Sequence, residues 1–209
     1  MNDSAAPGRF RQGSGRLCLD FLRTVRHRGT PEVTERLTDP EALAAWVRQC
    51  GPCYDALTTA GPAAGGPAGR PGAERLPGAE QLRDARALRE AVYVSVLAAL
   101  GPEGPCAVGA EARRRLNDAA AAAVPTPRLT PSGELVWQSA DPITATLALI
   151  ARDALDLVTS PALLARVHHC ASPTCGALFL DQSRPGTRRW CSMDTCGNRA
   201  KKAGLRARG

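Results

Sequence analysis

The sequence predicts a mainly α-helical protein built in two parts. A multihelical N-terminal domain with a small β-hairpin is followed by a treble-clef-like zinc finger, made of a knuckle, a β-hairpin and a short helix. Aromatic residues make up only 4% of the 209 residues, so the core must consist of small and aliphatic side chains, which favour helix-on-helix packing. Apolar residues recur at helical intervals along several segments. Four cysteines near the C-terminus form two equally spaced pairs.

The predicted helices are recognised by apolar stripes and by start signals. Asp39 followed by Pro40 fits an N-cap and a first helical position, and Asp141 followed by Pro142 repeats this arrangement. The segment 16–25 also has helical spacing, although its alternating start fits a short strand equally well. The other segments with helical spacing or start signals are 39–50, 79–100, 110–124, 141–158 and 160–166.

Three segments are expected to be non-helical. Residues 127–138 predict a β-hairpin that turns at Pro131-Ser132-Gly133. Residues 59–78 contain six Gly and four Pro, which predicts a flexible loop because so little apolar surface can be buried there. Residues 1–15 are expected to be a flexible N-terminus.

The cysteine pairs near the C-terminus have the spacing of a metal site. Cys170 and Cys175 are separated by four residues, as are Cys191 and Cys196, with fifteen residues between the pairs. Four thiolates complete the tetrahedral shell of one structural Zn²⁺. In a reducing cytosol, disulfides or unrelated free thiols are the less favoured alternative. His168 and His169 adjoin the first cysteine and could replace a thiolate. Because four cysteines already fill the shell, both are expected to support the ligands or to face a phosphate.

The residues between the cysteine pairs suggest how the pairs meet. Segments 177–181 and 186–191 are predicted to be two strands joined by a turn at 183–186, which brings the two ends together. Ser192 is expected to N-cap a short helix that carries the last cysteine. A unit of this size has too small a core to fold without its metal.

The net charge of +7 lies entirely in the C-terminal segment. Residues 166–209 contain nine basic and two acidic residues, whereas the rest of the chain contains 18 of each. A neutral body with a basic end favours a polyanion, such as DNA, as the partner of that end. A solvated basic tail is the alternative. The expected nucleic-acid contacts are Arg184, Arg188, Arg189, Asn198, Arg199, Lys201 and Lys202.

Some of these side chains have competing structural roles. Arg199 lies next to the metal site, where it can pair with Asp181 or donate to a thiolate instead of contacting DNA. Asn198 can satisfy backbone groups of the knuckle. Trp190 can stack on a base, but it is more simply explained as part of the core of the zinc finger.

Other function classes find little support in the sequence. Cys50 and Cys53 form a C-x-x-C motif, but they follow a predicted helix instead of opening one, so no thiolate activation is expected. Cys18 is expected in the core and Cys106 in a loop. The sequence has no phosphate-binding loop, H-E-x-x-H or G-x-S-x-G motif, so we expect no enzyme. It has no secretory signal and no apolar run of about 20 residues, so a cytoplasmic location without membrane contact is expected.

The motifs also resemble known families. The stretch RVHHCASPTCGALFLDQSRPGTRRWCSMDTCGNRAKK, residues 166–202, closely resembles the CGNR zinc finger, which is named for the tetrapeptide at 196–199. LCLDFLRTV (17–25) and LTDPEALAAWV (37–47) resemble the opening motifs of the helical ABATE domain. One departure is that Arg23 stands where ABATE sequences usually have Asn.

This resemblance implies an ABATE domain at 16–165, a zinc finger at 166–204 and a basic tail at 205–209. It also implies a bacterial, stress-induced transcription regulator. We therefore expect a zinc-binding, DNA-binding regulator with a helical sensor or interaction domain. The alternative is a zinc-stabilised protein–protein interaction module that does not bind nucleic acid. Because one finger offers a small interface, specific binding is expected to need a homodimer or a protein partner. The sequence indicates no particular effector.

Overall fold

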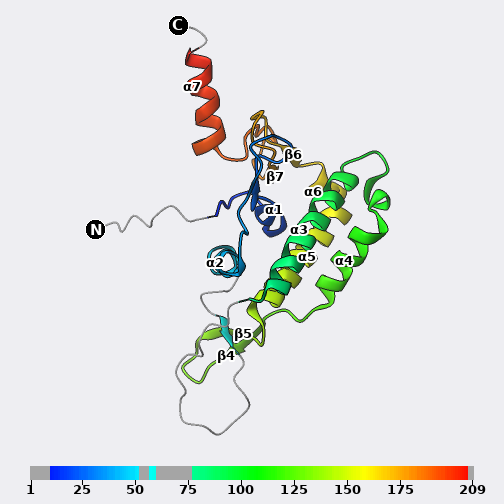
Figure 1. Cartoon of the computed structure of the whole chain (residues 1–209), viewed down its shortest axis with the longest axis vertical. Helices are drawn as coiled ribbons and strands as arrows, with labels where there is room; N and C mark the ends of the chain where they lie inside the picture. The colour runs from blue at the N-terminus through cyan, green and yellow to red at the C-terminus, as the bar shows by residue number, and fades with distance from the viewer. Residues whose placement is uncertain (1–9, 52–56, 60–76, 207–209) are drawn as a thin grey trace, which may run out of the picture.

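The fold is a helical body with a zinc finger at one end (Figure 1). The computed structural model describes residues 10–51, 57–59 and 77–206. The expectations for the first nine residues, for 60–76 of the Gly- and Pro-rich loop, for Cys53 and for the last three residues lie outside this part of the chain. For the rest, the mainly α-helical fold class is confirmed.

Three long helices form the centre of the body. These are α3 (Ala79–Ala99), α4 (Ala110–Ala121) and α5 (Pro142–Thr159), and each contacts the other two (Figure 1). Two shorter helices, α1 (Leu17–Leu22) and α2 (Pro40–Cys50), pack against α3 and α5. The ambiguous first segment is therefore a helix.

The helix starts follow the local signals in the sequence. The Asp39 side chain accepts a hydrogen bond from the backbone N–H of Ala42 at 2.7 Å, which caps α2. Asp141 caps α5 in the same way by accepting from the N–H groups of Ile143 and Thr144. Both expected N-caps are confirmed.

The core of the body is aliphatic, with one aromatic pair at its centre. Phe21 of α1 and Trp46 of α2 are fully buried and meet edge to face, with ring centroids 4.9 Å apart. Cys18 is also fully buried and serves as a small core residue, as expected. No described helix is both long and apolar enough to cross a membrane.

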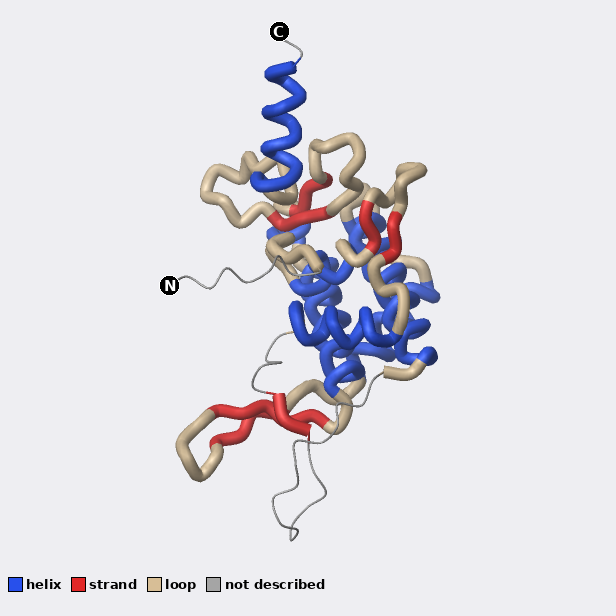
Figure 2. Tube along the Cα trace, turned by 60° about the vertical axis from the view of Figure 1, so that its left-hand side comes forward, coloured by secondary structure: helices blue, strands red, loops and turns tan. Residues whose placement is uncertain are grey.

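A small sheet lies at the end of the body that is remote from the C-terminus (Figures 1 and 2). Strands β4 (Thr126–Leu129) and β5 (Leu135–Ser139) form the predicted hairpin, and β3 (Leu57–Thr59) pairs in parallel with β5. The sequence did not predict β3. A second short antiparallel pair, β1 (Val25–Arg26) and β2 (Thr34–Glu35), follows α1.

The remaining elements lead from the body into the zinc finger. Helix α6 (Pro161–Leu164) precedes the antiparallel pair β6 (Val167–His169) and β7 (Leu178–Leu180). A π-helical turn, Met193–Gly197, then runs into α7 (Asn198–Arg206), which projects from the finger (Figure 1). A short 3₁₀ helix (Gly104–Ala107), which follows α3, carries the exposed Cys106.

The predicted strand pairing inside the finger was wrong. Strand β7 pairs with β6, and residues 186–191 form no strand. The reason is Asp181, whose carboxylate accepts hydrogen bonds from the N–H groups of Ser183 and Arg188, each at 2.8 Å. These bonds fold the chain around the carboxylate instead of letting it run back along β7. Ser192 precedes the π turn, but its side chain makes no capping hydrogen bond.

The finger shares its core with the body. Val167, Leu178 and Leu180 of β6 and β7 belong to the same buried cluster as Phe21 and Trp46. In addition, the N–H of Leu180 donates to the carbonyl of Ser14 at 2.7 Å, which adds the N-terminal segment to this small sheet. The finger therefore packs against the segment around Ser14 and against α1.

Candidate metal centre and its basic surroundings

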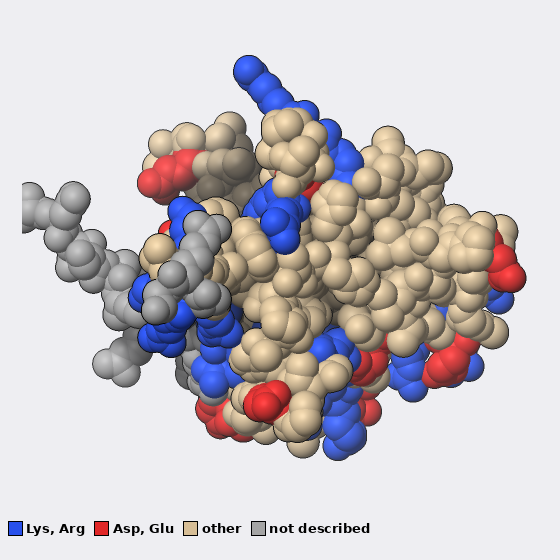
Figure 3. Space-filling view, turned by 90° about the horizontal axis from the view of Figure 1, so that it is seen from above, with Lys and Arg blue, Asp and Glu red and all other residues tan. Residues whose placement is uncertain are grey.

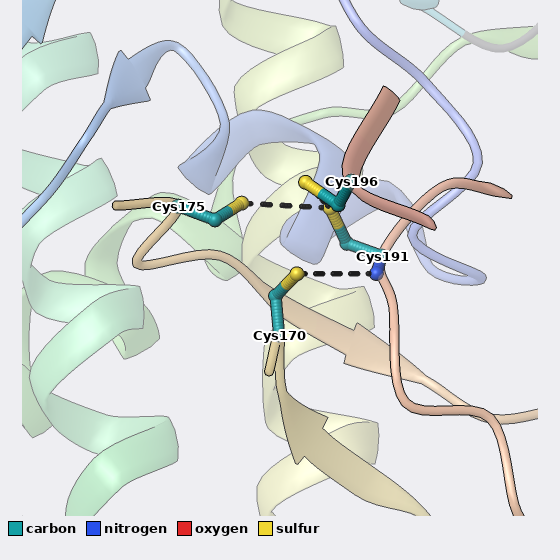
Figure 4. Close-up of side chains that lie close together, drawn as sticks. All are labelled: Cys170, Cys175, Cys191 and Cys196. Atoms are coloured by element: carbon teal, nitrogen blue, oxygen red, sulfur yellow. Dashed lines mark hydrogen bonds between the residues drawn. The ribbon is translucent and has the colours of Figure 1, made fainter. Parts of the chain in front are cut away.

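The four predicted cysteines converge on one point. Cys170 follows β6, and Cys175 lies in the turn before β7. Cys191 precedes the π turn, and Cys196 lies within it. Their four Sγ atoms all lie within 4.8 Å of one another and face a common centre (Figure 4). Tetrahedral zinc with Zn–S bonds of about 2.3 Å places sulfurs about 3.8 Å apart. The structure has Sγ–Sγ distances of 3.6 Å and 3.7 Å from Cys191 to two of the others.

This donor set fits one structural zinc ion. The S–S distances are far longer than the roughly 2.05 Å of a disulfide bond. All seven cysteines of the described residues are free, so the disulfide alternative is not supported. The closed set of four thiolates leaves no open coordination position, which is the arrangement of a structural site.

Backbone hydrogen bonds hold the two knuckles in place. The N–H of Cys170 donates to the carbonyl of Ala177 at 2.8 Å, and the N–H of Ala171 donates to the carbonyl of Arg189 at 2.9 Å. The second bond ties the two halves of the finger together. The N–H of Cys191 donates to the sulfur of Cys170 at 3.4 Å, a second link between the two halves.

The thiols influence one another strongly. Hydrogen bonding from Cys191 lowers the pKa of Cys175 to about 5, while the same pairing raises the pKa of Cys191. Burial, followed by the charge on Cys175, raises the pKa of Cys196. Four thiolates this close cannot all carry charge without a cation between them. Zinc binding therefore replaces the shared protons, which makes it dependent on pH.

A small apolar cluster supports the metal centre. The Phe179 ring of β7 is fully buried against Cys170, Cys191 and Cys196, and Trp190 packs on the outside of this group. The ring of His168 lies 5.9 Å from that of Phe179, centroid to centroid. Trp190 is therefore part of the core of the finger, which was the favoured alternative to stacking on a base.

The N-terminal domain also contacts the metal centre through a residue that the sequence analysis did not assign to it. Arg23 is only 7% exposed, and its guanidinium donates to the sulfur of Cys191 at 4.0 Å. It is held there by the carbonyl of Gln12 at 3.0 Å and the hydroxyl of Ser14 at 3.3 Å. The departure from Asn at this position was the one signal that could have pointed to it. Its charge partly offsets the negative charge of a tetrathiolate centre.

Arg188, one of the expected nucleic-acid contacts, makes several hydrogen bonds within the protein. Its Nε donates to the carbonyl of Trp190 at 2.8 Å, and its Nη2 donates to the carbonyls of Cys191 and Gly13. The guanidinium also lies over the Phe179 ring, 4.8 Å from the centroid. These bonds use Nε and Nη2, so Arg188 stabilises the finger, and its contact with nucleic acid stays a prediction.

The side chain of Arg199 has one hydrogen bond among the described residues. Its guanidinium donates to the hydroxyl of Thr174 at 3.5 Å, and not to Asp181 or to a cysteine sulfur. The amide of Asn198 donates to the carbonyl of Asp194 at 3.3 Å and so stabilises the π turn.

The Asp181 carboxylate, around which the chain folds, is stabilised in its charged form. Hydrogen bonds from Ser183, followed by the backbone of Arg188, lower the pKa of Asp181 to about 2.

Six basic residues of the described part of the finger are exposed, whereas Arg166 is half-buried and donates to the carbonyls of Asp181 and Ser183. Figure 3 views this end of the molecule and shows Lys and Arg side chains at several separate places on its surface. Within the described part of the chain, none of them forms an ion pair with a carboxylate, although Arg189 lies over the Trp190 ring at 5.3 Å. This exposed set consists of Arg184, Arg189, Arg199, Lys201, Lys202 and Arg206.

Helix α7 has two different faces. One face borders an open groove of about 410 Å³, to which Arg199, Lys202 and Arg206 contribute. Lys201 is not part of this groove, because consecutive helical residues point about 100° apart. No residue of α7 is buried, so both faces are available to a partner.

Of the C-x-x-C motif, Cys50 lies in the described part of the chain. It ends α2 and is only 7% exposed. Burial, with a smaller contribution from the Asp20 carboxylate, raises its pKa to about 12. The direction agrees with the expectation of an unactivated thiol, and its main cause is burial.

These features define a class of protein: a helical domain fused to a tetracysteine zinc finger with an exposed basic helix. Residues 15–161 match the ABATE family, described as "Putative stress-induced transcription regulator", and residues 166–209 match the CGNR zinc finger. The chain therefore belongs to the ABATE family and carries a CGNR zinc finger, which confirms the resemblance seen in its motifs. The comparison with curated proteins gave no match.

Proposed function

We propose that this protein is a DNA-binding transcription regulator, without catalytic activity, whose zinc finger contacts the phosphate backbone of duplex DNA. The observation that carries the proposal is the exposed basic set of the finger, none of which pairs with a carboxylate of the described residues. Unpaired cations on one end of a protein attract a polyanion and release its counterions on binding.

Helix α7 supplies the geometry for such contacts. It projects from the finger (Figure 1) and carries Arg199, Lys202 and Arg206 along one face. A helix fits the major groove of DNA, where side chains along one face can reach phosphates and base edges. The zinc centre fixes the start of this helix, because Cys196 lies in the π turn that leads into α7.

The remaining contacts come from the loop before the metal centre. Arg184 and Arg189 are exposed there, and the second of these stacks on Trp190. Stacking leaves the polar edge of the guanidinium free to reach a phosphate or a guanine. Together with the α7 face, about five phosphate contacts are available, which corresponds to a log–log salt slope of about −4 to −5.

The test is binding of the zinc-loaded full-length chain to duplex DNA at several salt concentrations, with and without a chelator. We expect a salt slope near −4 and loss of binding with the chelator, because α7 is positioned through the metal centre. Binding that does not change with salt, or that survives removal of zinc, would contradict the proposal.

One observation favours a protein partner instead. Leu205 is 71% exposed and Met193 is 48% exposed, which is unusual for large apolar side chains on so small a unit. A finger that binds no DNA at low salt but forms a stoichiometric homodimer or heterocomplex would support this second function.

A further inference from the structure

A small pocket lies between the N-terminal domain and the finger, directly beside the metal centre. Its volume is about 30 Å³, room for one small group, and it opens to solvent. The body and the finger each provide one wall. The lining residues are Arg11, Arg23, Val25, Arg26 and His27 on one side, and Cys175, Ala177, Cys196 and Arg199 on the other.

The pocket is rich in basic side chains. Four of its lining residues are arginines and none is Asp or Glu, while Cys175 and Cys196 are two of the zinc ligands. Within the described residues, Arg11 and Arg26 have no ion pair. Other arginines of the N-terminal domain do have acidic partners, because Arg28 and Arg89 both form ion pairs with Glu90. The Glu90 carboxylate does not line the pocket.

The cations repel one another. Burial, followed by the charges of Arg11, Arg36 and Arg23, lowers the pKa of Arg26. An anion between these groups would relieve the repulsion and would gain charge-assisted hydrogen bonds.

Both walls of the pocket are held in place without a ligand. His27 has a positive φ of 54°, and its Nδ1 lies 2.5 Å from the carbonyl oxygen of Thr174 in the finger. That carbonyl can only accept, so Nδ1 donates to it. On the same seam, Gly176 packs so closely on the Arg28 carbonyl that a Cβ atom would lie 2.3 Å from the oxygen. A preformed site of this kind loses little entropy when it binds a ligand.

We infer that this pocket binds the phosphate group of a ligand, held between Arg11 and Arg26 of the body and Arg199 of the finger. The small volume fits a single oxyanion group whose remainder extends into solvent. Because Arg199 also borders the groove along α7, an occupant would fix the position of a side chain that faces the proposed DNA surface. The phosphate belongs either to a small ligand or to the DNA backbone, and the experiment separates these sources.

The test uses inorganic phosphate, titrated into the zinc-loaded full-length protein at constant ionic strength set with chloride and followed by calorimetry. We expect saturable binding of one phosphate per chain, weakened at least tenfold by Arg26→Ala. Arg83→Ala, which removes the same charge from an exposed site on α3, should stay within twofold of the wild type. Arg11→Ala is the second variant and should behave like Arg26→Ala, and zinc content with circular dichroism checks the folding of each.

No saturable binding of phosphate, or equal loss in the Arg26 and Arg83 variants, would overturn the inference. Two further outcomes support it and identify the source. If phosphate competes with duplex DNA and Arg26→Ala weakens DNA binding, the DNA backbone supplies the group. If phosphate binds while DNA binding is unaffected, the ligand is a small molecule. The phosphate titration contains no DNA, so failure of the DNA-binding proposal leaves this result standing.

Discussion

Gly176 offers the sharpest test of how the finger is seated on the N-terminal domain. It has a φ of +64°, and a Cβ atom there would lie 2.3 Å from the carbonyl oxygen of Arg28. Gly186, in the same finger, has a nearly identical φ of +63° but nothing within 4 Å of its Cβ position. The two alanine variants therefore share the backbone strain and differ only in the contact with the body.

The expected costs follow from these two terms. An L-residue with positive φ loses about 1–2 kcal/mol, which applies to Gly176→Ala and to Gly186→Ala alike. Forcing a methyl group against a backbone oxygen adds about 1–3 kcal/mol of overpacking in the first variant alone. At about 2–4 °C per kcal/mol for a chain of this size, Gly176→Ala should melt about 2–12 °C below Gly186→Ala.

The measurement is thermal denaturation of both variants and the wild type, with zinc at the same saturating concentration so that metal linkage is held fixed. Equal melting temperatures for the two variants would refute the reasoning. That result would mean that the contact between Gly176 and the Arg28 backbone contributes nothing to stability.

Two further predictions concern single side chains. Arg23→Ala removes a charge-assisted hydrogen bond to the Cys191 sulfur; because the 4.0 Å contact is long, we expect the lower end of the usual 1.5–3 kcal/mol, or about tenfold weaker zinc binding. Chelator competition measures this, and an affinity within twofold of the wild type would contradict it. Cys50, with its pKa raised to about 12 by burial, should be alkylated far more slowly at pH 8 than the exposed Cys106, and at a rate that rises with pH. Site-resolved mass spectrometry measures both rates, and equal rates would show that Cys50 is activated or exposed.

The sequence predicted the parts of the structure that depend on local signals. The caps at Asp39 and Asp141 and the hairpin at β4–β5 each follow from residues only a few positions apart. The four zinc ligands were also predictable, because tetrahedral thiolate coordination restricts the spacing of the cysteines.

What the sequence could not predict depends on contacts between distant segments. The pairing of β3 with β5 joins residues 57–59 to 137–139, and no turn signal connects them. The cysteine spacing is compatible with either pairing of β7, and only the hydrogen bonds to Asp181 decide between them.

The inward orientation of two arginines also depends on contacts between distant segments. Arg23 reaches the sulfur of Cys191 across 168 positions of the chain, and Arg188 reaches the carbonyl of Gly13 across 175. A basic residue near the finger can therefore stabilise it or face a ligand, and its type alone does not distinguish these roles. The charge pattern predicted a basic surface but could not predict which of its members are turned inward.

The most direct test of the DNA-binding proposal compares two adjacent lysines of α7. Lys202 borders the groove that it shares with Arg199 and Arg206, whereas Lys201 does not. Both are exposed, and both changes to alanine remove one charge from the same helix. The measurement is the salt dependence of duplex binding by the zinc-loaded variants. We expect Lys202→Ala to flatten the log–log slope by about one unit and Lys201→Ala to leave it unchanged. Equal flattening by both variants, or none by either, would contradict the claim that this face of α7 meets DNA.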